Sequence, residues 1–196
     1  MPATCRILLI SGSLRGASTN SALLRTSRAC APDGVEAVLY EGMGSLPHFN
    51  PDEDPEGGPV HPAVAELRAA IGEADALLFC TPEYAGALPG SFKNLLDWTV
   101  GGGETYGMPV GWVNVSGPAS PTGASGAHDS LRSVLTYTGT DIVEQACVRI
   151  PVARAAVGPD GLISEPGVRA GAAAVLVALA ESVAAESRVA RMSVQE

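Results

Sequence analysis

The sequence predicts an α/β fold, a doubly wound parallel sheet of five strands with helices on both faces. Strand-like and helix-like segments alternate five times along the 196 residues, which is typical of parallel strands joined by right-handed crossovers. One run, Ala76–Thr81, is continuously apolar, as strands buried on both faces are. Loops rich in glycine and serine follow the first, third and fourth strands, at the edge where doubly wound sheets bind ligands.

Each expected strand is a short apolar run bounded by turn residues. The five runs are Arg6–Ile10, Val35–Tyr40, Ala76–Thr81, Val110–Ser116 and a strand within Ile142–Pro151. A long loop rich in glycine, proline and acidic residues, Glu41–Val60, follows the second strand. Neither a repeat nor a second domain is visible, so we expect a single domain over residues 1–196, with about 187–196 as a C-terminal tail.

Each strand is followed by a segment whose apolar residues recur at helical spacing. The expected helices are Thr19–Ala31, with Ala22, Leu23, Thr26, Ala29 and Cys30 on one side; one beginning at Pro62, with Val64, Leu67 and Ile71 inward; one opened by Pro89, with Phe92, Leu95, Leu96 and Thr99 in phase; one marked by Leu131, Val134, Leu135 and Thr138; and about Val168–Glu186, with Ala172, Val175, Leu176, Leu179 and Val183 on one side. Proline suits the first turn of a helix, because the N–H that it lacks would be unpaired there.

Composition limits the partners of the chain. The net charge is −9 and the pI is near 4.7, which argues against a general binder of nucleic acid or of anionic membranes, because neither polyanion would be attracted. A small anion held locally by backbone donors remains compatible with this charge. The three histidines, His48, His61 and His128, share no metal-ligand spacing, so we expect no metal site.

The cysteines and the chain ends indicate a reducing compartment. Cys5, Cys30, Cys80 and Cys147 are widely spaced and form no C-x-x-C pair, so we interpret them as small core residues, with a redox pair as the alternative. The N-terminus lacks the basic and apolar regions of a signal peptide. The apolar stretch Ala170–Ala180 is too short to span a bilayer. We therefore expect a cytoplasmic protein.

The loop Ser11–Asn20, SGSLRGASTN, has the character of a phosphate cradle. It runs from an apolar strand into a helix, whose first N–H groups lack partners and whose dipole favours an anion. Hydroxyl groups surround one cation, Arg15. The spacing fits neither the nucleoside-triphosphate loop, which needs a lysine, nor the dinucleotide fingerprint G-x-G-x-x-G. A loop for one terminal phosphate remains, with an ordinary serine- and glycine-rich turn as the alternative.

Two further loops resemble ligand loops. Pro82–Leu88 leaves the third strand and Ser116–Gly126 leaves the fourth. The carboxyl ends of parallel strands meet at one edge of the sheet, so we expect both loops to lie beside the cradle, with residues Ser11–Ser18 completing the site.

Two motifs together resemble the NADPH-dependent FMN reductase family, a flavodoxin-like group that includes quinone, azo-dye and chromate reductases. Gly12-Ser13-Leu14-Arg15 with Ser18 and Asn20 matches the family's G-S-x-R-x-x-S-x-N. Pro82-Glu83-Tyr84, Pro89-Gly90, Lys93-Asn94 and Asp97-Trp98 match its P-E-Y-x-x-x-x-P-G-x-x-K-N-x-x-D-W. The order and spacing of the elements also agree to about residue 185, so the resemblance covers nearly the whole chain.

The resemblance implies which residues hold FMN. The phosphate would be bound by residues of the first loop, and the ring and ribityl chain by the other two. The expected cofactor-binding residues are Ser11, Ser13, Arg15, Ser18, Thr19, Asn20, Pro82, Glu83, Tyr84, Ala85, Gly86, Ser116 and Gly117. Asn and Ser often follow the tyrosine of P-E-Y in the family, whereas Ala85 and Ala87 stand here, so any side-chain hydrogen bond from those positions is lost.

Several residues have a structural reading beside the functional one. Glu83 positions its loop or a neighbouring helix rather than acting as a base, because hydride chemistry on a flavin needs no protein base. Tyr84 is a wall for flavin or substrate, or an ordinary surface residue. Lys93 and Asp97 form a surface pair or belong to a subunit interface, and Trp98 belongs to the core or to that interface. His128 follows the third loop and can face the substrate.

The resemblance implies an FMN-dependent NAD(P)H oxidoreductase with no catalytic side chain. NADPH or NADH would give hydride to bound FMN, and a quinone, flavin, azo compound or metal oxyanion would then take the same place in a ping-pong cycle. It also implies a homodimer or homotetramer, with Phe92–Trp98 near the interface. The rival hypothesis is a flavodoxin-like electron carrier or flavin-binding module without nicotinamide turnover. A hydrolase is disfavoured, because the chain has no G-x-S-x-G elbow.

Overall fold

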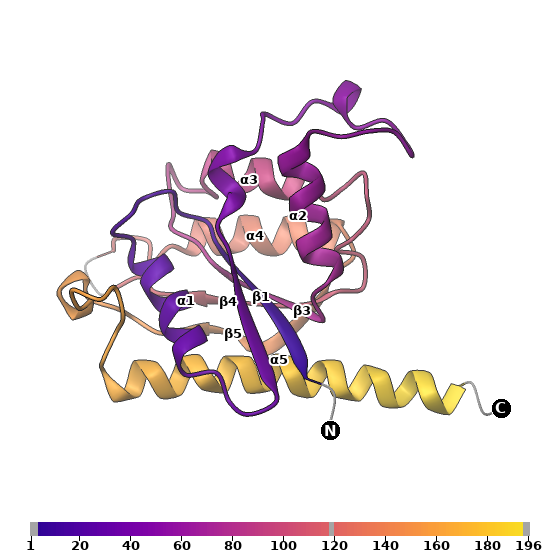
Figure 1. Cartoon of the computed structure of the whole chain (residues 1–196). Helices are drawn as coiled ribbons and strands as arrows, with labels where there is room; N and C mark the ends of the chain where they lie inside the picture. Colours follow the sequence, from indigo (N-terminus) through magenta and orange to yellow (C-terminus); the bar gives the residue numbers. More distant parts are fainter. Residues whose placement is uncertain (1–3, 118–119, 194–196) are drawn as a thin grey trace.

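The computed structural model describes residues 4–117 and 120–193 and contains a sheet of five parallel strands (Figure 1). The strands are β1 (Cys5–Ser11), β2 (Val35–Tyr40), β3 (Ala76–Cys80), β4 (Pro109–Asn114) and β5 (Asp141–Arg149), in the spatial order β2-β1-β3-β4-β5. From β1 the chain moves outward to β2 and then crosses back to β3 on the other side of β1. This reversal confirms the doubly wound α/β fold and creates a switch point between the carboxyl ends of β1 and β3.

Helices cover both faces of the sheet. α1 (Thr19–Ala29) and α5 (Pro166–Ser193) lie on one face, and α2 (Pro62–Gly72), α3 (Gly90–Asp97) and α4 (Ser125–Tyr137) lie on the other (Figure 1). Successive side chains of a strand point to opposite faces of the sheet, so alternate residues of each strand pack against the helices on one face or the other. Ile7 and Leu9 pack under α1 and α5, whereas Leu8 and Ile10 pack under α2, α3 and α4.

The inward faces expected of the helices are largely observed. Val64, Leu67 and Ile71 of α2 are buried, as are Ala172, Val175, Leu176 and Leu179 of α5. α1 ends at Ala29 rather than at Ala31, and Ala29 is exposed. Cys30 is the C-cap residue, with φ of −120° and ψ of 21°, so the helix ends there. Cys30 and Ala31 are nevertheless partly buried against the core under α1 and α5.

α5 continues beyond its predicted end. Its backbone is helical to Ser193, whereas the sequence predicts an end near Glu186. Of the expected C-terminal tail at about 187–196, residues 187–193 are helical and 194–196 lie outside the described residues. The apolar stripe fades after Val183, but no glycine or proline follows Gly171 to stop the helix. By length and mean hydropathy alone, Pro166–Glu186 passes as a membrane span. Its apolar stripe instead packs on the sheet beside α1.

The long loop after β2 is held down by α3. It contains two short 3₁₀ turns, Gly42–Ser45 and Pro51–Glu53. The indole N–H of Trp98 and the amide Nδ2 of Asn94 both donate to the carbonyl oxygen of Pro47, at 2.9 and 2.8 Å. Trp98 is fully buried. These two motif residues therefore stabilise the fold of the subunit, which confirms the core interpretation of Trp98.

Candidate functional site

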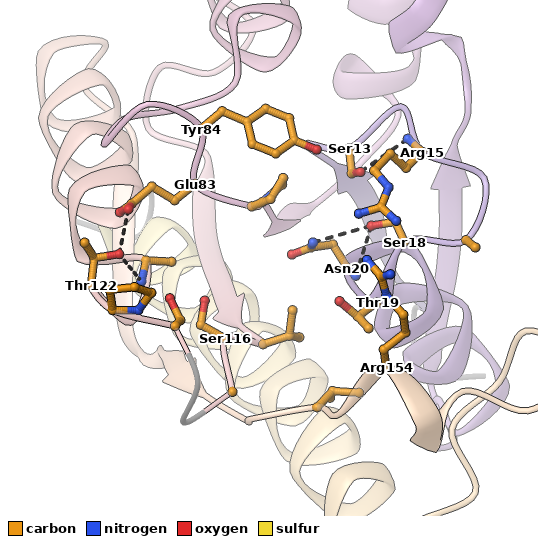
Figure 2. Close-up of a pocket in the computed structure, with 18 residues that line it drawn as sticks. Ser13, Arg15, Ser18, Thr19, Asn20, Glu83, Tyr84, Ser116, Thr122 and Arg154 are labelled. Atoms are coloured by element: carbon orange, nitrogen blue, oxygen red, sulfur yellow. Dashed lines mark hydrogen bonds between the residues drawn. The ribbon is translucent and has the colours of Figure 1, made fainter.

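A cavity of about 610 Å³ lies at the carboxyl edge of the sheet, between the loops that leave β1, β3, β4 and β5 (Figure 2). This volume falls in the usual range of small-molecule pockets. The lining residues are Ser13, Arg15, Ala17, Ser18, Thr19, Asn20, Pro82, Glu83, Tyr84, Val115, Ser116, Gly117, Ser120, Pro121, Thr122, Ala124, Val152 and Arg154. The three loops predicted from the sequence therefore do meet at one site.

The start of α1 forms one end of the cavity. Ser18 is the N-cap residue, and its hydroxyl accepts a hydrogen bond from the backbone N–H of Asn20 at 3.2 Å. The hydroxyl of Ser13 accepts from the N–H of Arg15 at 3.3 Å. Ser13, Ser18 and Asn20 are buried, although each is polar. The loop is thus shaped by its own hydroxyl groups, and the first turn of α1 opens into the cavity with its dipole directed at any bound anion.

Asn20 joins this end to the sheet. The thiol of Cys80, at the end of β3, donates to Asn20 Oδ1 at 3.3 Å, and Asn20 Nδ2 donates to the Ser18 hydroxyl at 3.4 Å. Complete burial raises the pKa of the Cys80 thiol, so the sulfur keeps its proton and remains a donor. All four cysteines are free thiols, and Cys80 acts as a core residue that fixes the orientation of Asn20.

The start of α4 forms the opposite end of the cavity, and a carboxylate already occupies it. Glu83 Oε1 accepts from the Thr122 hydroxyl at 2.6 Å (Figure 2). Its Oε2 accepts from the backbone N–H of Ala127 at 3.2 Å. The N-cap residue of α4, Ala124, has no side-chain oxygen, so Glu83 caps the helix from another loop. The pKa of Glu83 is lowered, chiefly by the Thr122 hydrogen bond.

The loop between Pro82 and Leu88 contains a tight turn. Tyr84 and Ala87 exchange both of their backbone hydrogen bonds at 3.1 Å, while Ala85 and Gly86 between them have φ of 51° and 75°. Two successive positive φ values define a type I′ turn, which favours Asn-Gly. Tyr84, 48% exposed, extends from this loop toward Ser13 and Arg15 across the cavity (Figure 2).

The loop after β4 is held at both of its ends. The Ser116 N–H donates to Asn114 Oδ1 at 2.9 Å, and Asn114 Nδ2 donates to the carbonyl of Gly123 at 2.7 Å. The guanidinium of Arg149 donates twice to the carbonyl oxygen of Ser116, at 3.2 and 3.0 Å. These contacts position Ser116 and Gly117 in the wall of the cavity.

Most of the predicted site residues line this cavity, but Ser11, Ala85 and Gly86 do not. The Ser11 hydroxyl lies 2.8 Å from that of Ser21 and accepts from the N–H of Ser13, so it braces the loop from behind and lines a separate cavity of about 190 Å³. Gly86 packs against α4: a Cβ built on Gly126 would collide with the carbonyl group of Gly86. Ala85, beside it, only forms the turn.

Several residues that line the cavity are not predicted by the sequence pattern. Thr122 lies in a loop that was recognised, but nothing in its spacing marked it as the partner of Glu83. Val152 and Arg154 follow β5, whose carboxyl end must lie at the same edge as those of the other parallel strands. That rule, together with a cation directly after the strand, would have identified Arg154.

Three further residues that the sequence singled out, His128, Lys93 and Asp97, do not line the cavity. His128 does not line it; its ring lies 6.2 Å from that of Trp112, and burial lowers its pKa. Lys93 and Asp97 form the expected surface pair, with 2.6 Å between Nζ and Oδ1. In the described part of the chain, no cluster of histidine, cysteine or acidic residues is arranged to hold a metal.

Fold and cavity together define a flavodoxin-like protein whose switch-point pocket suits a phosphorylated cofactor. The model of the NADPH-dependent FMN reductase family matches residues 5–154, and the chain belongs to that family. It is 34% identical over 166 residues to the NAD(P)H-dependent FMN reductase of Pseudomonas aeruginosa, covering 84% of this chain and 87% of that protein. It is 31% identical over 153 residues to a quinone reductase of Pseudomonas putida, covering 75% of each.

A solved structure agrees with these relatives. FerB, a flavoenzyme NAD(P)H:(acceptor) oxidoreductase from Paracoccus denitrificans, superposes with a TM-score of 0.74 at 26% identity and covers 90% of this chain and 98% of its own. Sequence and fold therefore assign the chain to the same group of enzymes.

Proposed function

We propose that the chain is an FMN-dependent oxidoreductase that takes hydride from NADPH or NADH and reduces a quinone or free flavin in a ping-pong cycle. The observation that carries the proposal is the polarity of the cavity. Its α1 end is built for an anion, its walls come from the two loops that match the family motifs, and it is large enough for a mononucleotide.

The residues fit FMN from end to end. Ser13, Arg15, Ser18 and the first turn of α1 would hold the phosphate, because hydroxyl groups, a guanidinium and outward N–H groups are its natural donors. Pro82, Tyr84 and Ser116 would flank the ring system. When bound, FMN supplies the chemistry, since a flavin accepts hydride from a nicotinamide and passes the electrons to a second substrate.

The side chains position reactants rather than transfer protons. Glu83 is the acidic residue in the cavity wall, and its two oxygens already accept from Thr122 and Ala127. Its lowered pKa makes it a poor base near neutral pH. This favours a structural role for Glu83, with donor and acceptor using the same open side of the cavity in turn.

Subunit assembly and location complete the proposal. We expect a homodimer or homotetramer in the cytoplasm. Phe92, Leu95, Leu96 and Trp98 are buried within the subunit, so an interface at α3 must use its outer face, around Lys93 and Asp97. A solution mass of 19.9 kDa for the holoprotein, measured by light scattering, would contradict the assembly.

The test is steady-state kinetics on the FMN-reconstituted protein. Oxidation of NADPH and NADH is followed with benzoquinones of different size and with free flavin, after chromatography has identified the released cofactor. We expect bound FMN, and parallel double-reciprocal lines when donor and quinone are both varied. A holoprotein that binds FMN but turns over neither nicotinamide with any acceptor would refute the reductase and leave an electron carrier.

A further inference from the structure

Arg154 is a cation in the cavity wall that the family motifs do not include. It begins a short 3₁₀ turn, Arg154–Ala156, directly after β5. The backbone before it is fixed to β4, because Ile150 and Val152 donate to the carbonyls of Asn114 and Val115 at 2.9 and 3.0 Å. The backbone after it is fixed by the bridge between Val157 and Ile163. The backbone on both sides of Arg154 is therefore held in place by hydrogen bonds.

The guanidinium groups of Arg15 and Arg154 approach the start of α1 from different loops (Figure 2). Within the described residues, neither lies in a salt bridge, whereas Arg6, Arg68 and Arg132 each pair with carboxylates. Unpaired cations at one helix N-terminus are notable in a chain of net charge −9. Both side chains are exposed, so solvent screens the repulsion between them, and an anion bound between them would gain from both charges and from the helix end.

We infer that Arg154 is a second phosphate-binding guanidinium, which together with Arg15 makes the site selective for FMN over riboflavin. The inference rests on the proposed flavin-binding function. A phosphate monoester carries between −1.5 and −2 charges near pH 7. One arginine neutralises about half of that charge, and a second arginine neutralises the remainder. The planar guanidinium donors also match the geometry of the phosphate oxygens.

The opposite end of the cavity supports this orientation. The carboxylate of Glu83 lies there, held by Thr122 and α4, and it would repel a phosphate. Riboflavin, which lacks the phosphate, gains nothing from either arginine. The dianion is therefore expected at the end where Arg15 and Arg154 converge.

The experiment compares the dissociation constants of FMN and riboflavin, measured by flavin fluorescence at low and moderate salt. For Arg154→Gln we expect FMN affinity to fall by about 10- to 100-fold, the usual effect of losing a charged hydrogen bond, with riboflavin affinity unchanged. The FMN affinity of Arg154→Lys should lie between those of wild type and Arg154→Gln, because lysine keeps the positive charge but lacks the paired planar donors of a guanidinium. Arg28→Gln, an exposed arginine in the last turn of the same helix, removes the same charge and should change neither constant.

Three results would overturn the inference. Unchanged FMN affinity in Arg154→Gln would remove Arg154 from the site. An equal loss for FMN and riboflavin would make it a structural residue of the loop. Unchanged FMN affinity with a higher KM for NADPH, but not for NADH, would assign it to the nicotinamide's 2′-phosphate. A wild-type protein that binds neither flavin would refute the proposed function itself.

Discussion

Two helices begin at the edge of the same cavity, and their N-termini are used in opposite ways. α1 is capped by its own Ser18 and opens into the cavity beside Arg15. α4 begins at Ser125 after the N-cap residue Ala124, which has no side-chain oxygen, and it is instead capped by Glu83 from the loop after β3. Both ends carry the same partial positive charge, but at α4 a carboxylate of the chain has already neutralised it.

This difference explains the orientation of the site. An anionic ligand group finds free donors and unpaired guanidinium groups at α1 and a fixed negative charge at α4. The family motifs supply both halves, because Arg15 and Ser18 belong to one motif and Glu83 to the other. Three changes test the contrast between the two ends of the cavity. They alter the backbone at Gly12 near α1, the charge of Glu83 near α4, and the turn at Ala85.

The largest expected effect is that of Gly12→Ala, at the α1 end. A Cβ on Gly12 would lie 2.6 Å from Thr81 Cβ and 3.0 Å from Phe92 Cδ1, so the loop must move away from β3. Overpacking of this kind destabilises a protein by about 1–3 kcal/mol, and the displaced loop should also weaken FMN binding. Denaturant unfolding and FMN titration measure the two effects.

Gly16→Ala in the same loop is the matched control. A Cβ there meets no atom within 4 Å, so both stability and FMN affinity should stay near wild type. If Gly12→Ala and Gly16→Ala lost equal stability and FMN affinity, the loop would tolerate no side chain at either position, and close packing at Gly12 would not explain the effect.

A smaller effect is expected for Glu83→Gln, at the α4 end. The amide leaves the Ala127 N–H facing a poorer partner, so the melting temperature should fall. Because the pKa of Glu83 is lowered in the folded protein, its stabilisation is present above the ordinary carboxyl pKa, about 4.3, and is lost as the pH falls through the folded value. The difference from wild type should therefore shrink on acidification.

Melting curves from pH 7 to pH 3 measure this difference. Glu56→Gln, an exposed acid in the loop after β2, should differ little from wild type at any pH. A gap between Glu83→Gln and wild type that does not change with pH would rule out the charge of Glu83 as its cause.

The smallest effect, and the only stabilising one, is expected for Ala85→Gly in the turn between the two ends. Ala85 has a φ of 51°, which costs an L-residue with a Cβ about 1 kcal/mol relative to glycine. Stability should rise by about that amount in denaturant unfolding, with FMN affinity unchanged because Ala85 lies outside the lining. Ala87→Gly, without a positive φ, should instead lose stability.

Periodicity was a reliable guide to the elements and a poorer guide to their ends. The inward faces of α2 and α5 follow directly from apolar spacing, because burial of those residues drives the packing. α1 stops earlier than its stripe suggests, and α5 continues seven residues beyond Glu186, to Ser193. Helix ends depend on caps and on the absence of breakers, which a hydrophobic pattern does not record.

The loops of the site also contain features that the sequence predicts and features that it does not. Alternating strands and helices place three small-residue loops at one edge, and motif spacing marks Ser13, Arg15 and Ser18 within them. That Ser11 points behind the loop and Gly86 toward α4 depends on strand pleat and turn geometry. These emerge only when the sheet has formed.

The doubly wound sheet, the cradle before α1 and the family to which the chain belongs follow from the local spacing of residues along the sequence. The distribution of charge across the cavity depends on tertiary contacts. The pairing of Glu83 with Thr122 and the convergence of Arg154 on α1 join residues far apart in the chain. Local patterns cannot specify such contacts, since the closing of the sheet edge brings them together.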